Sequence, residues 1–516
     1  MPQPHEASAN AVERFVIAPA RRAPSGVAVI DAATGRQWTR TEMADGVKRA
    51  ATLLSTSGVM AEQRVMLIMA DTPSFLWFFW GAMWIGAVPV PVSTMLTTKD
   101  YQFLLADSRA TAVVISPAFT ATALAATEGQ PHLHHVFVDD VPLGDVPGAD
   151  SANSANPFPA VPDDIAFWLY TSGTTGFPKA ARHRHVDIGF CTDAYASGVL
   201  AMGPTDRVYS VAKLFFAYGL GNSGFFPAGL DATVVLNPGR PVPSEVAEHV
   251  RTFRPTLFFG VPTFYAALLN ADLPVDTFSS VRLAVSAGEP LPGDLHRRFR
   301  ERFGVEVLDG IGTTEIAHIF VSNRPGRSRP NSSGTPVEGY EIQLRDGEGK
   351  VVLDGESGDL WVAGESVTVG YWNRTELNRR VLQGRFMATG DEYIRNEDGS
   401  YTYLGRTDDM LKVGGIWVSP NEVEATIMEL DDVALAAVVG APDPDGNIKP
   451  RAFVVAARPD VDPAALVPAV QAHVKARLAP FKYPRWVEVV SELPTTATGK
   501  IKRYLLREVP MDGRGH

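Results

Sequence analysis

Short, continuously apolar segments alternate with amphipathic segments through the N-terminal part of the chain. Amphipathic segments at 244–253 and 293–303 separate some of the apolar runs, which occur at 64–69, 87–92, 111–116, 135–140, 232–237, 256–261 and 281–289. Strands that are apolar along their whole length belong to sheets covered on both faces, and helices between them favour parallel pairing. We therefore predict an α/β fold with a large N-terminal body of parallel or mixed sheets flanked by helices.

The pattern changes after about Tyr340. Residues 341–364 alternate apolar and polar side chains around Asp346-Gly347 and Asp354-Gly355, which are turn sequences typical of antiparallel hairpins. These features predict a β-rich subdomain at about 340–405, at the end of an N-terminal domain that spans residues 1–407.

The remaining residues, 408–516, have the pattern of a small α+β domain. Ser419 to Glu422 form a capping-box sequence with proline at the first helical position, which predicts a helix to about Leu430. Two apolar strands come next, followed by a helix with Leu466 and Val470 on its apolar face and by a last strand. We predict that this domain forms a compact lid on the N-terminal body.

The composition excludes several classes of protein. The net charge is 47 − 58 = −11 and the lysines and arginines form no block, so we expect no binding to nucleic acid. The one cysteine, Cys191, excludes a disulfide framework and a cysteine-rich metal site. Residues 1–20 lack the basic and then apolar pattern of a signal peptide, which makes the cytoplasm the expected compartment.

One uncharged and aromatic stretch, Phe75–Val92, just reaches the length of a membrane span. Gly81, Gly86, Pro89 and Pro91 interrupt it, and no lysine or arginine lies close to either end. We therefore expect a helix at 74–85 followed by a buried strand at 87–92, and no interaction with a membrane.

The most informative segment is the string Tyr170-Thr-Ser-Gly-Thr-Thr-Gly-Phe-Pro-Lys179, which follows an apolar strand at 165–169. Its glycines permit a tight turn whose amide hydrogens converge on an anion, its hydroxyl side chains add donors, and Lys179 adds a positive charge. The Gly-Lys-Ser/Thr ending of a Walker loop is absent. A polar turn is the structural alternative, but so many hydroxyl and glycine residues before a lysine favour phosphate binding.

This string closely resembles the signature of the adenylate-forming superfamily, which contains acyl- and aryl-CoA ligases, peptide-synthetase adenylation domains and firefly-type luciferases. Further segments resemble the family's motifs in the same order: Asp309-Gly-Ile-Gly-Thr-Thr-Glu315, Thr389-Gly-Asp391, Gly405-Arg-Thr-Asp-Asp-Met-Leu-Lys-Val-Gly-Gly415 and Thr498-Gly-Lys500. The resemblance covers the chain from about Phe15 to Arg507. It implies that the protein uses ATP, Mg²⁺ and coenzyme A, and that the small C-terminal domain is mobile about a hinge at Asp408.

The resemblance implies a role for each nucleotide motif. Glu315 offers a carboxylate that suits Mg²⁺ between ATP phosphates, Thr314 would donate to the α-phosphate, and Asp391 would accept both ribose hydroxyls. Asp309 would contact the adenine amino group, and Ile311 stands where most members of the family carry an aromatic residue. The implied ATP- and AMP-binding residues are Thr171, Ser172, Gly173, Thr174, Thr175, Lys179, Ala287, Gly288, Glu289, Asp309, Gly310, Ile311, Gly312, Thr313, Thr314, Asp391, Arg406 and Lys500.

Lys500 resembles the family's mobile catalytic lysine, which would act with Thr314, Glu315 and the hinge residue Asp408. A carboxylic acid with a pKa near 4 is already an anion at neutral pH, so its attack on the α-phosphate needs cations rather than a general base. Lys500 would bridge the two anions. The implied CoA-binding residues are Gly414, Gly415, Trp417, Lys482 and Arg485, and ordinary surface charge is the alternative for the last two.

The substrate acid is expected between the aromatic segment Lys213-Leu-Phe-Phe-Ala-Tyr-Gly-Leu-Gly-Asn222 and the residues near His318, and Phe216-Ala-Tyr-Gly219 and Ile316-Ala-His-Ile-Phe320 lie within these two places. Both places resemble the benzoate-CoA ligase branch of the family, which implies a flat, narrow slot for an aromatic ring. The implied lining residues are Ala217, Tyr218, Gly219, Ser286, Ala287, Ile311, Gly312 and His318. The structural alternative for His318 is a core histidine satisfied by a backbone partner. Benzoate, anthranilate and hydroxybenzoates all stay open, and a long-chain fatty acid is disfavoured.

These features together predict an ATP-dependent aryl-acid:CoA ligase that forms an aryl-AMP and then transfers the acyl group to CoA. The alternatives are an adenylation protein that loads the phosphopantetheine of a carrier protein, and a catalytically silent acyl or nucleotide sensor. The lack of a carrier-like domain after Lys500 opposes the first, and the complete set of motifs opposes the second. The sequence leaves the oligomeric state open, with a homodimer as one expectation.

Overall fold

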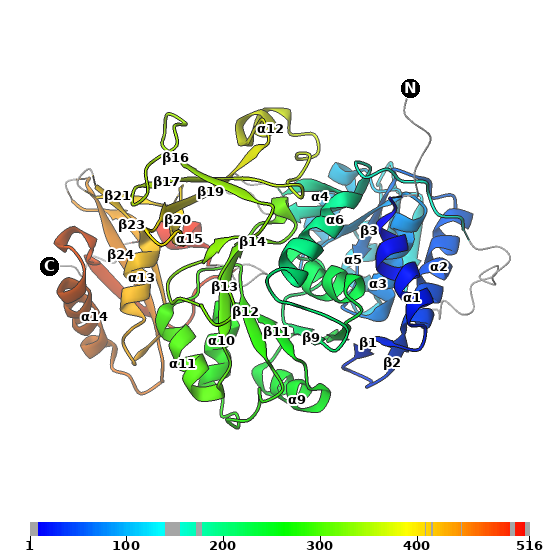
Figure 1. Cartoon of the computed structure of the whole chain (residues 1–516). Helices are drawn as coiled ribbons and strands as arrows, with labels where there is room; N and C mark the ends of the chain where they lie inside the picture. The colour runs from blue at the N-terminus through cyan, green and yellow to red at the C-terminus, as the bar shows by residue number, and fades with distance from the viewer. Residues whose placement is uncertain are drawn as a thin grey trace.

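The structure is a computed structural model that describes residues 9–139, 155–171, 178–407, 409–413, 416–444, 446–495 and 501–510, with the backbone alone at 416 and 417. Figure 1 shows a large N-terminal body with a smaller C-terminal group of strands and helices beside it.

A nine-stranded sheet forms the centre of the N-terminal body, in the order β15-β14-β13-β12-β11-β9-β10-β1-β2. The strands from β13 to β1 in this order are parallel, and antiparallel strands close the sheet at both edges. The bounds are β1 Val27–Asp31, β2 Gln37–Thr39, β9 Arg207–Ser210, β10 Thr233–Leu236, β11 Leu257–Gly260, β12 Leu283–Ser286, β13 Val307–Gly312, β14 Ile319–Ser322 and β15 Thr335–Pro336.

A second sheet contains four parallel strands in the order β4-β3-β5-β6. Its bounds are β3 Arg64–Ile68, β4 Val88–Pro91, β5 Ala112–Ile115 and β6 His135–Val138. Each of the apolar runs that the sequence marks in the N-terminal body is thus a strand, and the parallel pairing confirms the α/β prediction.

Helices cover both sheets, and one helical layer packs between them. A single buried core joins β1, β9 and β10 to β3 and β5 through this middle layer, which contains η1 Glu13–Ile17, α1 Ala18–Arg22, α2 Arg40–Thr56, α3 Pro73–Trp84, α6 His185–Cys191, η4 Thr192–Ser197, α7 Ala217–Leu220, η5 Gly221–Phe225 and α8 Phe226–Gly229. The outer face of the larger sheet packs against α9 Pro243–Phe253, α10 Pro262–Asn270 and α11 Gly293–Phe303. The outer face of the smaller sheet packs against α4 Thr98–Ser108 and α5 Thr120–Leu124, which follows η2 Pro117–Phe119.

The aromatic stretch considered as a membrane span is a buried helix followed by a strand, as the sequence predicts. Helix α3 begins with Pro73, its N-cap Thr72 accepts a hydrogen bond from the Phe75 amide at 3.4 Å, and eleven of its twelve residues are buried. Within the described ranges, no helix is both long and apolar enough to cross a bilayer.

The signature string connects two antiparallel strands, β7 Ile165–Thr171 and β8 Lys179–Arg184. Their register pairs Thr171 with Lys179, so the two ends of the string lie opposite each other. Residues 172–177 lie outside the described residues.

The region predicted as a β-rich subdomain contains an antiparallel sheet made of β16 Glu341–Arg345, β17 Ser357–Ala363, β18 Leu382–Gln383, β19 Phe386–Arg395 and β20 Tyr401–Arg406. Helix α12, Thr375–Val381, precedes β18. The predicted hairpin pattern of this region is confirmed.

The C-terminal elements form a three-stranded sheet, β23-β24-β25, packed against α13 and α14. The bounds are β21 Leu411–Val413, β22 Ile416–Val418, α13 Pro420–Ile427, β23 Val433–Pro442, β24 Ile448–Ala456, α14 Pro463–Arg477, η7 Pro480–Lys482, β25 Trp486–Val490 and α15 Arg503–Glu508. Ser419 caps α13 by accepting from the Glu422 amide at 3.2 Å, whereas the Glu422 carboxylate accepts from Lys482. The predicted helix start is confirmed, and the glutamate forms an ion pair rather than closing the capping box.

Candidate functional site

The predicted acid and nucleotide residues gather at one edge of the nine-stranded sheet. Strands β9, β12 and β13 are parallel, so the segments that follow them emerge at the same edge. These segments contain Phe216–Gly219, Ser286–Glu289 and Thr313–His318. Ligands of open α/β sheets bind outside the carboxyl ends of the strands, which makes this edge the candidate active site.

Glu315 is the centre of a cluster that joins three distant parts of the chain. Its carboxylate accepts from the Tyr371 hydroxyl at 2.5 Å and from the Thr313 hydroxyl at 2.8 Å, and it lies 3.7 Å from the Lys179 ammonium. Lys179 in turn donates to the Tyr371 hydroxyl at 2.7 Å. The structure therefore places the last residue of the signature string beside the glutamate of the second motif.

The charges in this cluster stabilise one another. Burial alone would raise the pKa of Glu315, but Lys179, Tyr371 and Thr313 outweigh it and the pKa is lowered. Burial lowers the pKa of Lys179, and the Glu315 carboxylate opposes that shift. Glu315 is consequently an anion at neutral pH, beside a lysine that is partly withdrawn from water.

The ribose motif and the hinge motif meet across β19 and β20. Arg406 donates to the Asp391 carboxylate at 3.0 Å and to the Thr389 carbonyl at 2.9 Å. Burial would lower the pKa of Arg406, yet the pKa is raised because the carboxylates of Asp391 and Glu315 lie nearby. Asp391 and Arg406 thus belong to the same electrostatic neighbourhood as Glu315 and Lys179.

Two buried polar atoms at the sheet edge lack a protein partner. Within the described part of the chain, no hydrogen bond reaches Oδ1 of Asp309 or Oγ of Ser286. Burial raises the pKa of Asp309 well above its ordinary range. Buried polar atoms without partners are costly, so such atoms at a candidate site suit a ligand that pairs with them. For Asp309, the exocyclic amine of adenine has that chemistry.

His318 is buried and its tautomer follows from a chain of hydrogen bonds. Ser210 donates to the Ala212 carbonyl at 3.2 Å, and the Asn222 amide nitrogen donates to Ser210 at 3.3 Å. The Asn222 oxygen therefore faces Nε2 of His318, which donates to it over 3.0 Å. Burial lowers the pKa of His318 to about 3, so the ring is neutral and Nδ1 is an acceptor.

Nδ1 of His318 has no hydrogen-bond partner among the described residues. The ring packs against Tyr218, with centroids 5.5 Å apart, and against Phe226 at 4.4 Å. Gly221 permits this packing, because a Cβ there would lie 2.3 Å from the ring. The structural alternative is a core histidine satisfied by a backbone partner. Here Nε2 contacts the Asn222 side chain, and a hydrogen bond with the Tyr218 backbone partly offsets the lowering of the His318 pKa by burial.

Other predicted lining residues shape the surroundings of His318. The Tyr218 hydroxyl donates to the Val285 carbonyl at 3.1 Å, and Ala217 and Ala287 are buried. A Cβ on Gly219 would lie 2.0 Å from the Lys213 carbonyl, so this position requires glycine for the chain to turn. Ile311 is half-buried at the end of β13.

Several predicted residues lie outside the described residues: Ser172, Gly173, Thr174, Thr175, Asp408, Gly414, Gly415, Lys500 and the side chain of Trp417. Their roles stay predictions. Lys482 forms an ion pair with Glu422 at 2.7 Å, and Arg485 is exposed and donates to Tyr483 at 2.8 Å. CoA binding by these two residues also stays a prediction.

Mg²⁺ binding through Glu315 fits the donors at the site. The described residues contain no group of three or more side chains that could hold a metal ion by themselves. Mg²⁺ is commonly held by one or two carboxylates together with substrate phosphates and water. Glu315 would supply such a carboxylate.

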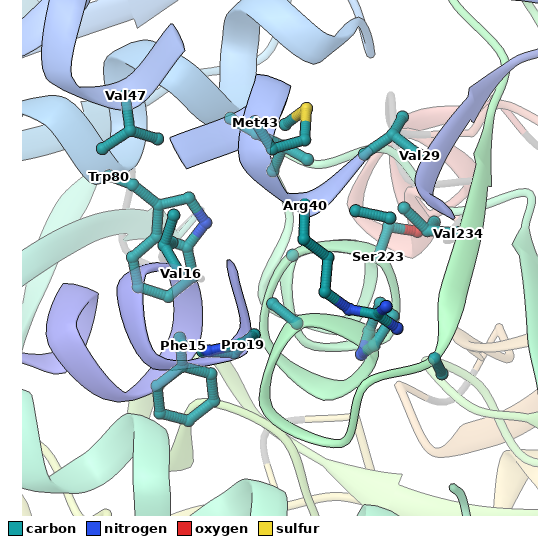
Figure 2. A pocket seen from close by; sticks show the side chains of 16 residues that line it. Phe15, Val16, Pro19, Val29, Arg40, Met43, Val47, Trp80, Ser223 and Val234 are labelled. Atoms are coloured by element: carbon teal, nitrogen blue, oxygen red, sulfur yellow. The ribbon is translucent and has the colours of Figure 1, made fainter. Parts of the chain in front are cut away.

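A separate cavity of about 50 Å³ lies in the helical layer between the two sheets. Figure 2 shows its mostly apolar wall, with Phe15, Met43 and Trp80 around it and the Arg40 side chain beside it. None of the predicted site residues that the structure describes lines this cavity. It is therefore distinct from the candidate active site.

Sequence reasoning missed Tyr371, and it gave no role to Asn222, which ends the segment expected beside the acid. Tyr371 lies in no motif, and it reaches Glu315 because its backbone bridges to Ala181 in β8. Asn222 carries a signal that sequence reasoning could have used, since it is a polar residue between Gly221 and Ser223 at the end of a largely apolar segment. It is fully buried.

Comparison with known proteins agrees with this geometry. The sequence model of the AMP-binding enzyme family matches residues 17–372, and that of the AMP-binding enzyme C-terminal domain matches residues 422–500. The 4-hydroxybenzoate--CoA/benzoate--CoA ligase of Rhodopseudomonas palustris is 43% identical over 92% of this chain and 89% of that protein.

Two solved structures are similar over nearly the whole chain. A benzoate CoA ligase from Burkholderia xenovorans LB400 has a TM-score of 0.89 and 41% identity, covering 96% of this chain and 99% of that one. The anthranilate CoA ligase AuaEII in complex with anthranoyl-AMP has a TM-score of 0.92 and 36% identity, covering 98% of both chains. The chain belongs to the AMP-binding enzyme family.

Proposed function

We propose that the protein is an ATP-dependent aryl-acid:CoA ligase, an AMP-forming acid–thiol ligase. It activates benzoate or a small substituted benzoate as an aryl-AMP and transfers the acyl group to the thiol of CoA. The observation that carries the proposal is the cluster of Lys179, Glu315 and Tyr371 at the sheet edge that also holds Tyr218 and His318. The relatives' activities on benzoate, hydroxybenzoate and anthranilate support the same reaction class.

The chemistry of the first half-reaction explains the need for fixed cations. The attacking carboxylate and the α-phosphate are both anions, and charge grows on the phosphoryl oxygens as the new bond forms. Lys179 and Lys500 supply positive charge, and Thr314 donates to the α-phosphate. Mg²⁺, when bound at Glu315, neutralises phosphate charge. No side chain is required to remove a proton from the acid.

The second half-reaction needs access for CoA. A thiol with a pKa near 8.5 is partly ionised at neutral pH, and AMP is a good leaving group, so a strong base is dispensable. Lys500 would stand in the path of the pantetheine arm. We therefore keep rotation of residues 408–516 about Asp408, with Gly414 and Gly415 along the channel, as part of the proposal. A homodimer and a cytoplasmic location also stay predictions.

A screen of acids tests the proposed function. We expect acid-dependent pyrophosphate release with benzoate and with at least some hydroxy- or aminobenzoates, and none with long-chain fatty acids, because the resemblance implies a short slot closed by Tyr218, Ile311 and His318. The second product should be a thioester of free CoA. Thioester formation with carrier protein alone would favour the carrier-loading alternative, and a lack of pyrophosphate exchange with every acid would favour a sensor.

His318→Leu tests whether the open acceptor on Nδ1 reads a ring substituent. We expect the ratio of kcat/KM for the fastest hydroxy- or aminobenzoate over that for benzoate to fall about three- to tenfold, because the substituent loses one neutral hydrogen bond. The control is Tyr195→Phe, which removes a hydroxyl from a ring 5.2 Å from His318 and should leave the ratio unchanged. An unchanged ratio in His318→Leu would mean that the histidine does not contact the substituent.

A further inference from the structure

The turn that carries Thr314 and Glu315 is held from outside at three consecutive carbonyl oxygens. The Thr314 carbonyl lies 2.8 Å from Nε2 of His183, the Glu315 carbonyl accepts from the Thr368 amide at 2.8 Å, and the Ile316 carbonyl accepts from the Ser366 hydroxyl at 2.8 Å. Each of the three donors comes from a segment remote in the sequence. The backbone position of both predicted catalytic residues is thus determined by β8 and by the segment before Tyr371.

The turn needs this support because a strained residue follows it. Ala317, which follows the turn directly, has a φ of +69° and a ψ of −28° and is fully buried. An alanine with positive φ is unfavourable and persists when the surrounding structure over-determines it. The strained alanine separates Glu315, which points toward Lys179, from His318, which points toward Asn222. If the backbone of the turn were not held in this way, Glu315 would no longer be directed toward Lys179, nor His318 toward Asn222.

His183 is the one ionisable side chain among these three donors, and its hydrogen bonds constrain its protonation. It is fully buried in β8, and its ring stacks on Phe167 at 5.0 Å. Nδ1 lies 3.2 Å from the Asp187 carboxylate, and Nε2 lies 2.8 Å from the Thr314 carbonyl. A carbonyl oxygen only accepts, so Nε2 carries a hydrogen.

The contact of Nδ1 with Asp187 requires a hydrogen on that nitrogen too. Asp187 accepts from the Arg184 amide at 3.0 Å and from the Arg184 guanidinium at 3.1 Å, so it is held as a carboxylate. Arg184 also pairs with Asp163 and Glu365. A carboxylate facing Nδ1 needs a donor there, so Nδ1 carries a hydrogen as well. The ring that satisfies both contacts is an imidazolium paired with Asp187.

We infer that His183 is a positioning residue for adenylate formation, an imidazolium that links Asp187 to the Thr314 carbonyl and so holds the turn presenting Thr314 and Glu315. The inference rests on the proposed function for the reaction it serves. A charge-assisted hydrogen bond is stronger and more directional than a neutral one, which suits a donor that must hold a strained turn. His183 itself touches neither substrate nor nucleotide in this role.

Two substitutions separate the two contacts. His183→Asn places an amide near Nδ1 and keeps the contact with Asp187, whereas His183→Gln places an amide near Nε2 and keeps a donor for Thr314. We expect kcat of acid-dependent pyrophosphate exchange to fall roughly ten- to hundredfold in His183→Asn and about threefold or less in His183→Gln. The KM for ATP and thioester formation from supplied aryl-AMP should change little in either variant.

His185 provides the matched control. It is also buried, and its Nδ1 accepts from the Ala11 amide at 3.1 Å; burial lowers its pKa to about 4. His185→Asn keeps that acceptor and should leave both half-reactions unchanged. Equal losses in His183→Asn and His183→Gln, or parallel losses in both half-reactions, would show a general structural role and overturn the inference.

Nitrogen NMR of the full chain labelled at histidine gives a readout that does not depend on turnover. From its two contacts, both ring nitrogens of His183 should carry hydrogen, with the signal assigned by its loss in His183→Gln, whereas Nδ1 of His185 should be bare. A bare nitrogen on His183 would overturn the inference even if the variants lose activity. If the wild-type protein forms no aryl-AMP from any acid, the proposed function fails while the spectra still report on the imidazolium.

Discussion

Replacing Glu315 by glutamine is expected to slow aryl-adenylate formation by about two to three orders of magnitude, because the site loses the anion that pairs with Lys179 and suits Mg²⁺. Tyr371 and Thr313 both contact the carboxylate through hydrogen bonds, 2.5 and 2.8 Å long, that an amide can largely reproduce. The loss should therefore fall on the reaction rather than on folding. Acid-dependent pyrophosphate exchange measures the first, and thermal unfolding measures the second.

The pH dependence of the Glu315→Gln enzyme carries a second signature. Burial lowers the pKa of Lys179, and the Glu315 carboxylate counteracts it. Without that carboxylate the pKa of Lys179 falls further, so the lysine loses its proton at lower pH. As the pH is raised, the residual activity of the variant should therefore begin to decline earlier than that of the wild type. Tyr371→Phe is the matched control, since it removes one contact of the same carboxylate without removing charge, and should cost tenfold or less, roughly one hydrogen bond. A Glu315→Gln enzyme as active as Tyr371→Phe would contradict the role assigned to the carboxylate.

Most strands and helices could be predicted from the sequence, because a short apolar run indicates a buried strand without reference to the rest of the chain. Each run marked in the N-terminal body became a strand, and the helix predicted at 74–85 is observed as Pro73–Trp84. The apolar runs do not indicate which strands pair with each other. The strand at 165–171 pairs antiparallel with β8 in a two-stranded sheet of its own, and its apolar sequence does not indicate which strand it pairs with.

The same limit applies to the candidate site. Lys179 and Glu315 lie far apart in the sequence, and the resemblance alone predicts that they act together. Their shared partner Tyr371 lies in no motif, because a hydroxyl that bridges two charges requires a spatial position and no particular sequence context. Glu422 shows the converse: its local capping pattern is present, yet a lysine distant in the sequence takes its carboxylate. Tertiary contacts decide how such side chains are used.

Lys500→Ala should divide the two half-reactions. We expect aryl-adenylate formation to fall by roughly a hundredfold or more, because one cation between carboxylate and α-phosphate is removed where charge accumulates. Thioester formation from supplied aryl-AMP should stay within about threefold of the wild type, since in that step no free carboxylate has to be brought to the phosphate. Pyrophosphate exchange and thioester release, measured separately, give the two rates.

The division matters because it distinguishes a mobile catalytic lysine from a fixed one. A lysine needed only while carboxylate and phosphate are joined can leave before the thiol arrives, and its removal then costs the first step alone. Lys179, which is held by Tyr371 at 2.7 Å, is fixed and serves as the comparison: Lys179→Ala should weaken binding of ATP as well as the rate of adenylation, because its charge is present before the reaction starts. If Lys500→Ala slowed both half-reactions equally, Lys500 would be a fixed residue like Lys179. The C-terminal domain would then have no need to rotate between the two steps.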